Sequence, residues 1–125
     1  MPEISKADVY RKAAEVIVRD GKTEGRLVEG TDRGTRDSEI IGRLVSGQGA
    51  VCAIGACARA EAELYGNLPV GEADLLYGRY SFGVDWDLGL GLKVYSIFAV
   101  NDDRHTSAED IALLLKHRAE EIDGG

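Results

Sequence analysis

The chain has 125 residues, 44% hydrophobic and 30% charged, which excludes wholesale disorder and predicts one ordinary domain. Its formal net charge is −7, and the excess lies in one half: residues 1–50 carry nine acids and nine bases, whereas residues 51–125 carry thirteen acids and six bases. Such a half repels a phosphate backbone, and no apolar run approaches the ~20 residues that span a bilayer, so neither nucleic acid nor membrane is expected as a partner.

The first expected element is a helix from about Ser5 to Asp20. Ser5 is a typical N-cap residue, and Asp8, three positions later, completes a variant of the capping box. Apolar residues then recur at helical spacing until Gly21, which provides a stop. This apolar stripe contains Val9, Tyr10, Ala13, Ala14, Ile17 and Val18.

Residues 22–38 form a polar segment that contains three glycines and only two apolar residues, Leu27 and Val28. We expect a long flexible loop here, with room for one short strand. Loops of this length are uncommon unless they are functional or mobile. The segment is therefore where we expect disorder or a contact with a partner.

The alanine-rich segment at residues 50–66 predicts a second long helix that ends at Gly66. Before it, Glu39–Val45 is a short apolar run that suits a strand or a helical turn. The predicted helix carries little side-chain bulk, so it can pack very close to its neighbours. We expect it at the centre of the fold.

Residues 67–100 are less clear. Turns are expected at Asn67–Gly71, followed by one helical turn near Glu72–Tyr77. Between residues 88 and 93, leucines alternate with glycine or lysine, which is typical of a strand. The run Val94–Val100 is β-branched and aromatic, which also favours a strand, although a buried helix would tolerate it.

A last helix is predicted after Thr106, which forms the pattern of a capping box with Glu109. Apolar residues follow at helical spacing, and three cationic residues at 116–118 lie where the helix dipole favours them. Together these elements predict a single domain over residues 1–125, α+β in class and mainly helical. Its N-terminal, central and C-terminal helices would form the core, with at most a small β-sheet.

Two short motifs resemble those of a known family. Cys52–Ala56 (C-A-I-G-A) opens the alanine-rich helix, and Asn101-Asp102 precedes the capped final helix. The order resembles that of a domain family of unknown function found in actinobacteria and their bacteriophages. In that family a Trp commonly precedes both motifs; here Val51 and Val100 stand there, which indicates buried apolar positions. The resemblance implies an architecture and a phage or actinobacterial origin, but no activity.

Cys52 is the strongest candidate for catalysis. A cysteine in the first turn of a helix meets the positive end of the helix dipole, which lowers the pKa of the thiol. His105 would be the partner base, and Asp102 is a third candidate if the fold gathers them. We favour the competing interpretation, a small buried thiol, because the flanking pattern of a cysteine enzyme is missing. Cys57 is five residues away in the same helix, so the two thiols face apart and no disulfide is expected.

Three other patterns are weak. Residues 47–52 are similar to a dinucleotide fingerprint, but the chain is short for a full nucleotide-binding fold. Asn101, Asp102 and Asp103, together with Asp85 and Asp87, could hold a hard cation. The set matches no EF-hand loop, and an Asx turn anchored by Asn101 or Asp102 is the competing explanation. The cysteines and histidines lack the spacing of a zinc site. We expect no cofactor and no metal.

Aromatic residues are enriched at binding hot spots. Trp86, Tyr77 and Tyr80 are therefore candidate binding residues if they form an exposed patch, and core packing is the alternative. We expect a non-catalytic accessory protein that binds another protein, either a host protein or a second copy of itself. The alternatives are a cysteine-dependent enzyme that uses Cys52 and His105, or a structural assembly subunit.

The expected compartment is the cytoplasm, or the host cytoplasm if a phage encodes the protein. Two cysteines suit a reducing interior, and the N-terminal sequence MPEISKADVYRK lacks the apolar region of a secretory leader.

Overall fold

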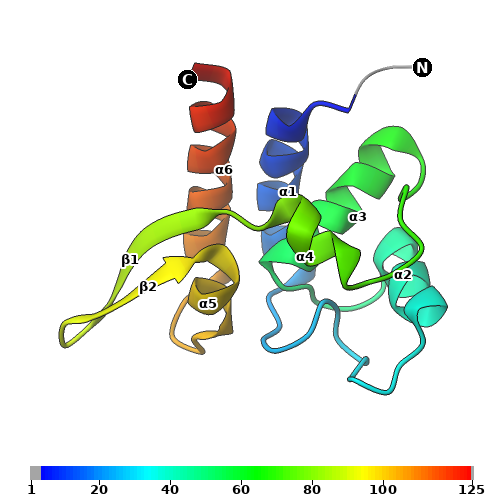
Figure 1. Cartoon of the computed structure of the whole chain (residues 1–125), viewed down its shortest axis with the longest axis horizontal. Coiled ribbons are helices and arrows are strands. Elements are labelled where there is room, and N and C mark those ends of the chain that lie inside the picture. The colour runs from blue at the N-terminus through cyan, green and yellow to red at the C-terminus, as the bar shows by residue number, and fades with distance from the viewer. Residues whose placement is uncertain (1–3, 125) are drawn as a thin grey trace.

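A computed structural model describes residues 4–124 of the chain, which form six helices and one antiparallel hairpin (Figure 1). In chain order these are α1 (Lys6–Asp20), α2 (Asp37–Ser46), α3 (Ala53–Tyr65), α4 (Leu75–Tyr80), β1 (Gly83–Gly89), β2 (Leu92–Ser96), α5 (Ile97–Asp102) and α6 (Ala108–Gly124). The prediction of a mainly helical fold with a small sheet is confirmed. Along residues 4–124, no helix combines the length and the apolar character that crossing a bilayer requires.

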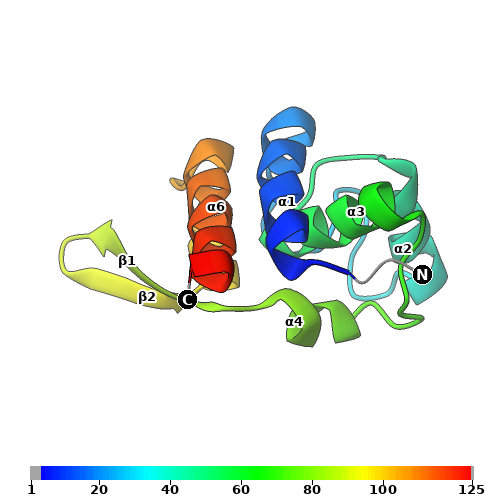
Figure 2. The same ribbon diagram turned by 90° about the horizontal axis from the view of Figure 1, so that it is seen from above.

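The core lies where α1 packs against α6 on one side and α3 on the other. Figures 1 and 2 both show α1 and α6 side by side, with α3 next to α1. In α3 the ten residues Ala53–Ala62 are all buried, which confirms the expected central position. Small side chains make this possible, because neighbouring elements can approach the helix from several directions.

The first helix begins as predicted, with Ser5 as N-cap. The Ser5 hydroxyl accepts a hydrogen bond from the Asp8 backbone N–H at 3.2 Å. The second half of the predicted capping box is wrong, because the Asp8 carboxylate pairs with Arg11 instead (2.9 Å). The Ser5 N–H donates to the hydroxyl of Tyr65 at the end of α3, so the cap also ties α1 to the central helix.

The cap of the last helix lies one residue later than predicted. Ser107 and Asp110 form the reciprocal pair: the Ser107 hydroxyl accepts from the Asp110 N–H, and the Asp110 carboxylate accepts from the Ser107 N–H, both at 3.1 Å. Thr106 is buried beside this turn, so its side chain is not the cap. Two overlapping patterns could cap this helix, T-x-x-E from Thr106 and S-x-x-D from Ser107. The structure uses the second, in which Asp110 is the acid.

The ambiguous regions resolve into helix and hairpin. The run that begins at Glu39 belongs to α2, a helix rather than a strand. Residues 84–100 are not one strand, because a turn at residues 90–91 separates β1 from β2. The strand predicted over Val94–Val100 ends at Ser96, whose hydroxyl accepts from the Ala99 N–H at 3.3 Å and so caps α5. The expected helical turn near Glu72–Tyr77 is α4, shifted to Leu75–Tyr80.

The loop between α1 and α2 is attached to the body by backbone hydrogen bonds. Val51 exchanges hydrogen bonds with the strand-like start of the loop, donating to the Gly21 carbonyl and accepting from the Thr23 N–H, each at 3.0 Å. Further on, the Cys52 N–H donates to the Leu27 carbonyl at 3.2 Å. The predicted mobility of residues 22–38 stays a prediction, but part of this loop is built into the base of α3.

The hairpin and α2 lie at opposite ends of the molecule. In both views the hairpin extends beyond α6, away from the core, whereas α2 lies beyond α3 (Figures 1 and 2). Phe82, just before β1, anchors the hairpin through two contacts. Its ring packs edge-on against Tyr10 with 5.3 Å between the ring centroids, and the guanidinium of Arg118 in α6 lies over the Phe82 ring. Beyond Phe82 the hairpin extends away from the packed helices.

Candidate functional site

The thiol of Cys52 is a helix cap. Cys52 is the N-cap residue of α3, is only 4% exposed, and its Sγ accepts a hydrogen bond from the Gly55 N–H at 3.3 Å. Burial raises the pKa of this thiol to about 11, with the nearby Asp102 charge adding to the effect. The predicted lowering by the helix dipole is wrong, because desolvation outweighs it. Cys57 is fully buried, and both cysteines are free, as expected.

Gly55 completes the Cys-x-x-Gly pattern for a steric reason. A Cβ built on Gly55 would overlap the backbone carbonyl oxygen of Leu27 and lie 3.1 Å from its carbonyl carbon. Only glycine therefore lets the loop pass this close to α3. That approach also places the Leu27 carbonyl where the Cys52 N–H can donate to it.

The second motif holds the same region together from the other side. Asn101, fully buried at the end of α5, accepts at Oδ1 from the Ala53 N–H and donates from Nδ2 to the Thr23 carbonyl, both at 2.9 Å. The next residue, Asp102, accepts from the Gly25 N–H at 3.0 Å. Lys22 also donates from Nζ to the Asn101 carbonyl at 2.6 Å.

We call the set Lys22, Cys52, Gly55, Asn101 and Asp102 the joint. It connects the loop, the N-terminus of α3 and the end of α5, so both recognisable motifs act on one place in the fold.

The three catalytic candidates do not gather in one cleft. Cys52 is buried, whereas Asp102 and His105 are exposed. The backbone N–H of His105 donates to the Asp103 carboxylate at 3.1 Å. In residues 4–124 the His105 imidazole makes no hydrogen bond to Cys52 or Asp102. Across that same range, no group of three His, Cys, Asp or Glu side chains could hold a metal ion.

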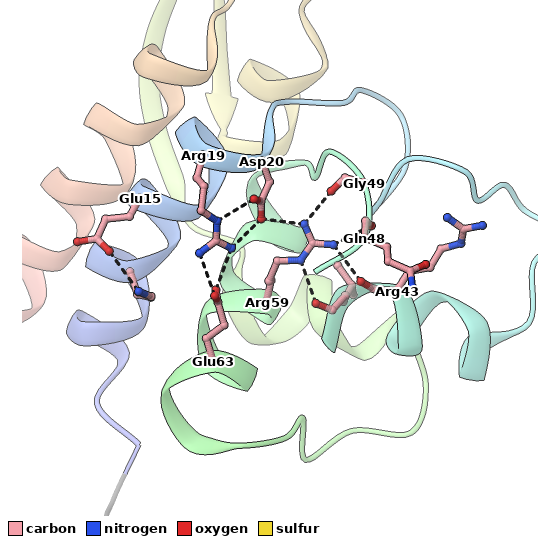
Figure 3. A network of polar contacts seen from close by, with 10 residues as sticks. Glu15, Arg19, Asp20, Arg43, Gln48, Gly49, Arg59 and Glu63 are labelled. Atoms are coloured by element: carbon pink, nitrogen blue, oxygen red, sulfur yellow. Dashed lines mark hydrogen bonds and ion pairs between the residues drawn. The ribbon is translucent and has the colours of Figure 1, made fainter. Parts of the chain in front are cut away.

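Arg59 is a fully buried cation in the middle of α3, and sequence reasoning missed it (Figure 3). Its guanidinium makes five hydrogen bonds: Nε to the Leu44 carbonyl (2.9 Å), Nη1 to the Gly49 carbonyl (2.7 Å) and Asp20 Oδ2 (3.0 Å), and Nη2 to the Arg43 and Gln48 carbonyls (both 2.9 Å). The side chain thereby joins the ends of α1 and α2 to the central helix. The available signal was a single arginine that follows six apolar or small residues at the start of the alanine-rich helix.

Two further ion pairs surround this buried arginine. Arg19 binds Asp20 through both its Nε and Nη2 atoms, so Arg19, and after it Arg59, hold the pKa of the Asp20 carboxyl below its ordinary value against the effect of burial. On the other side of α3, the buried Glu61 accepts two hydrogen bonds from Arg79 of α4, at 3.0 and 3.1 Å. These charges are paired within the fold.

The three predicted aromatic binding residues do not form one exposed patch. Tyr80 is fully buried, and its backbone carbonyl accepts from the Tyr10 hydroxyl at 2.9 Å. Tyr77 is half-buried, and burial raises the pKa of its hydroxyl to about 12. Trp86 lies half-buried on β1. The exposed aromatic side chains are instead Tyr95 on β2, which is 66% exposed, and Phe98 on α5.

We call the exposed apolar side chains of the hairpin and of the start of α5 the hairpin surface: Leu90, Leu92, Tyr95 and Phe98. Successive residues of a strand point to opposite faces, so Leu92 and Tyr95 lie on opposite faces of β2. Leu90 is fully exposed at the tip, between Gly89 and Gly91, and is the sole non-glycine residue in residues 4–124 with a positive φ, at 55°. A leucine in this conformation costs roughly 1–2 kcal/mol.

A small cavity of about 210 Å³ lies elsewhere, beside the loop of residues 22–38. Leu27, Ile40 and Ala73 line it, together with charged residues that include Arg26 and Asp74. Ligand sites commonly measure ~300–1,000 Å³, so this volume is below the usual range for a small-molecule site.

A model of a family of unknown function (DUF6197) matches residues 1–121. No curated protein and no solved structure matches the chain.

Proposed function

The chain belongs to the DUF6197 family of unknown function, and from this premise we propose that it is a non-catalytic accessory protein that binds another protein through the hairpin surface. The observation that carries the proposal is Leu90. It combines an unfavourable backbone conformation with full exposure of a large apolar side chain. Strain of this kind concentrates at functional sites.

The rest of the hairpin surface supports the same interpretation. Leu92 and Tyr95 follow Leu90 on β2 and are both more than half exposed. Single exposed leucines are ordinary, but large apolar and aromatic side chains gathered on a projecting element are typical of an interaction site. The hairpin projects from the body (Figures 1 and 2), so a partner can reach these side chains without moving a helix.

We also propose where the protein acts. Two free thiols suit a reducing compartment, and the motifs at Cys52–Ala56 and Asn101-Asp102 resemble those of actinobacterial and phage proteins. The cytoplasm of an actinobacterium, or of one infected by a phage that encodes the protein, fits both observations.

Affinity capture with a matched control tests the hairpin surface. The double variant Leu90→Asp/Leu92→Asp should reduce the retained amount of a specific partner at least about tenfold, because removing hot-spot side chains costs more than ~1.4 kcal/mol. The control is Leu75→Asp, which changes an exposed leucine of α4 and should leave capture unchanged. The readout is mass spectrometry of proteins retained from an actinobacterial lysate, to which a tagged copy of the chain is added.

Equal retention by the wild type, the hairpin variant and the control would refute the proposal. Circular dichroism on all three proteins separates lost binding from lost folding.

A further inference from the structure

The outer edges of the hairpin differ in their capacity to pair with another strand. Within residues 4–124 the sheet consists of β1 and β2 alone, so each strand has one edge without a strand partner. Gly83 pairs with Ser96 and Trp86 with Val94, so β1 contains one residue more than β2 between these two pairs. Asp87 pairs with Lys93 and Gly89 with Leu92, so β1 again contains one residue more. Both extra residues lie in β1. Irregularities of this kind protect an edge from pairing, and β2 has none.

We propose that the regular edge of β2 pairs with β2 of a second copy of this chain, which gives a continuous four-stranded antiparallel sheet about a two-fold axis. The inference rests on the proposed function and names its partner. An isolated two-stranded hairpin is marginal in water, and three or more strands with an apolar face are needed for independent stability. Pairing with an identical edge satisfies this requirement and closes the assembly at two copies.

One register fits the side chains of β2 best. If Val94 lies opposite its own copy, all five residues of the strand find a partner: Lys93 lies opposite Tyr95 of the second copy, and Leu92 opposite Ser96. A shift of one residue would turn the half-buried face of one copy towards the exposed face of the other. A shift of two towards the tip would place Lys93 opposite Lys93, and like charges directly opposite are destabilising.

The charges and rings of the exposed face are complementary in this register. Within one copy Lys93 already lies 3.4 Å from Asp85, so its charge is partly compensated. In the dimer its ammonium also meets the ring of Tyr95, an arrangement that attracts a cation to an aromatic face. A net charge of −7 on each chain opposes association of the acidic halves, but the paired edge itself carries no acid.

The same register accounts for the remaining apolar side chains. Extending it past Leu92 carries the tip of one hairpin towards the start of α5 in the second copy, where Phe98 is exposed. The strained Leu90 thereby gains an apolar neighbour. On the opposite face, the half-buried Val84, Trp86 and Val94 of both copies form one wider apolar surface.

Sedimentation velocity over a range of concentrations tests the dimer, with two variants at one exposed position. Tyr95→Lys places a second cation opposite Lys93 and should raise the dissociation constant at least tenfold. Tyr95→Glu creates an opposite-charge pair and should leave the constant unchanged or lower it. Wild-type protein that remains monomeric up to about 1 mM, where binding free energy is only ~4 kcal/mol, would overturn the inference. Equal weakening by both variants would also overturn it.

Disulfide crosslinking tests the register independently. Val94→Cys should form a covalent dimer under mild oxidation, because directly opposite Cβ atoms lie ~4.5–5.5 Å apart. Tyr95→Cys is more exposed but should not crosslink, because diagonal neighbours lie ~7–8 Å apart. Cys52 and Cys57 are buried and add little background. Preferential crosslinking of the Tyr95→Cys protein would contradict this register.

The outcomes separate the two proposals. A monomeric wild type whose captured partner is still lost in the Leu90→Asp/Leu92→Asp protein would refute self-pairing and leave the hairpin surface as a binding site. Capture that ignores the hairpin, together with a monomeric wild type, would refute both.

Discussion

Replacing Arg59 with methionine should lower the free energy of unfolding by about 3–5 kcal/mol, the usual cost of removing one partner of a buried ion pair. Methionine fills similar space but donates no hydrogen bond. The carbonyls of Gln48 and Gly49 and the carboxylate of Asp20 would lose their Arg59 partner at partly buried positions, and the buried Leu44 carbonyl would lose its partner as well. Since a domain is commonly stable by only ~5–15 kcal/mol, this loss is a large fraction of the total.

Urea unfolding followed by circular dichroism measures the Arg59 effect, with Arg19→Met as the matched control. Arg19 contacts the same Asp20, but its side chain is 47% exposed, and exposed ion pairs contribute about 0–1 kcal/mol. The Arg59 variant should therefore lose several times more stability than the control. Equal losses would mean that the five hydrogen bonds of Arg59 do not hold the ends of α1 and α2.

Replacing Gly55 with alanine should destabilise the protein by about 1–3 kcal/mol, the range for overpacking a core. Alanine is the better helix former by ~0.5–1 kcal/mol, so local propensity alone predicts the opposite sign. The added methyl group must displace the Leu27 carbonyl, and with it the hydrogen bond that this carbonyl accepts from Cys52. The contact between the loop and the N-terminus of α3 would therefore be disrupted at Gly55.

Gly42→Ala in α2 is the control for Gly55, measured by the same unfolding experiment. Gly42 is also a helical glycine with an ordinary φ, and a Cβ there meets no atom within 4 Å. This substitution should raise stability by about 0.5–1 kcal/mol. If both substitutions stabilise the protein, the close approach of the loop to α3 is not a constraint.

The long helices could be predicted from the sequence because their signals are local. Ser5 and the apolar stripe that follows it lie within α1, and Gly66 adopts the left-handed conformation that ends α3. Local competition explains the errors: Ser107 replaces Thr106 as the cap, and Ser96 begins a helix inside a run whose composition favours a strand. A capping hydroxyl decides each boundary over the propensity of the residues around it.

The joint and the buried network could not be predicted, because their partners are far apart in the sequence. Asn101 contacts Ala53, 48 residues away, and Thr23, 78 residues away. Arg59 donates mainly to backbone carbonyl groups, which every residue carries. No pattern of side chains in the sequence therefore predicts these hydrogen bonds. The sequence did point to the right residues in Cys52 and Asn101-Asp102, but a motif does not show whether it serves chemistry or packing.

The structure gives that distinction a physical basis. Each motif residue described above has a partner within the fold: Cys52 caps α3, Gly55 admits the loop, and Asn101 and Asp102 hold it. The strained Leu90 and the next most exposed large apolar side chains, Tyr95 and Leu92, lie instead on the hairpin. We therefore assign stability to the joint and propose binding for the hairpin surface.

Alkylation of Cys52 by iodoacetamide at pH 8, compared between native and urea-unfolded protein, tests this assignment most directly. A thiol pKa of about 11 instead of the ordinary 9.0 leaves roughly a hundredth of the thiolate, and burial restricts access further. We predict that the native protein reacts at least about 100-fold more slowly, and that unfolding restores an ordinary rate. A native Cys52 that reacts as fast as the unfolded chain would show an open, activated thiol, and a catalytic role for the joint would then replace the structural one.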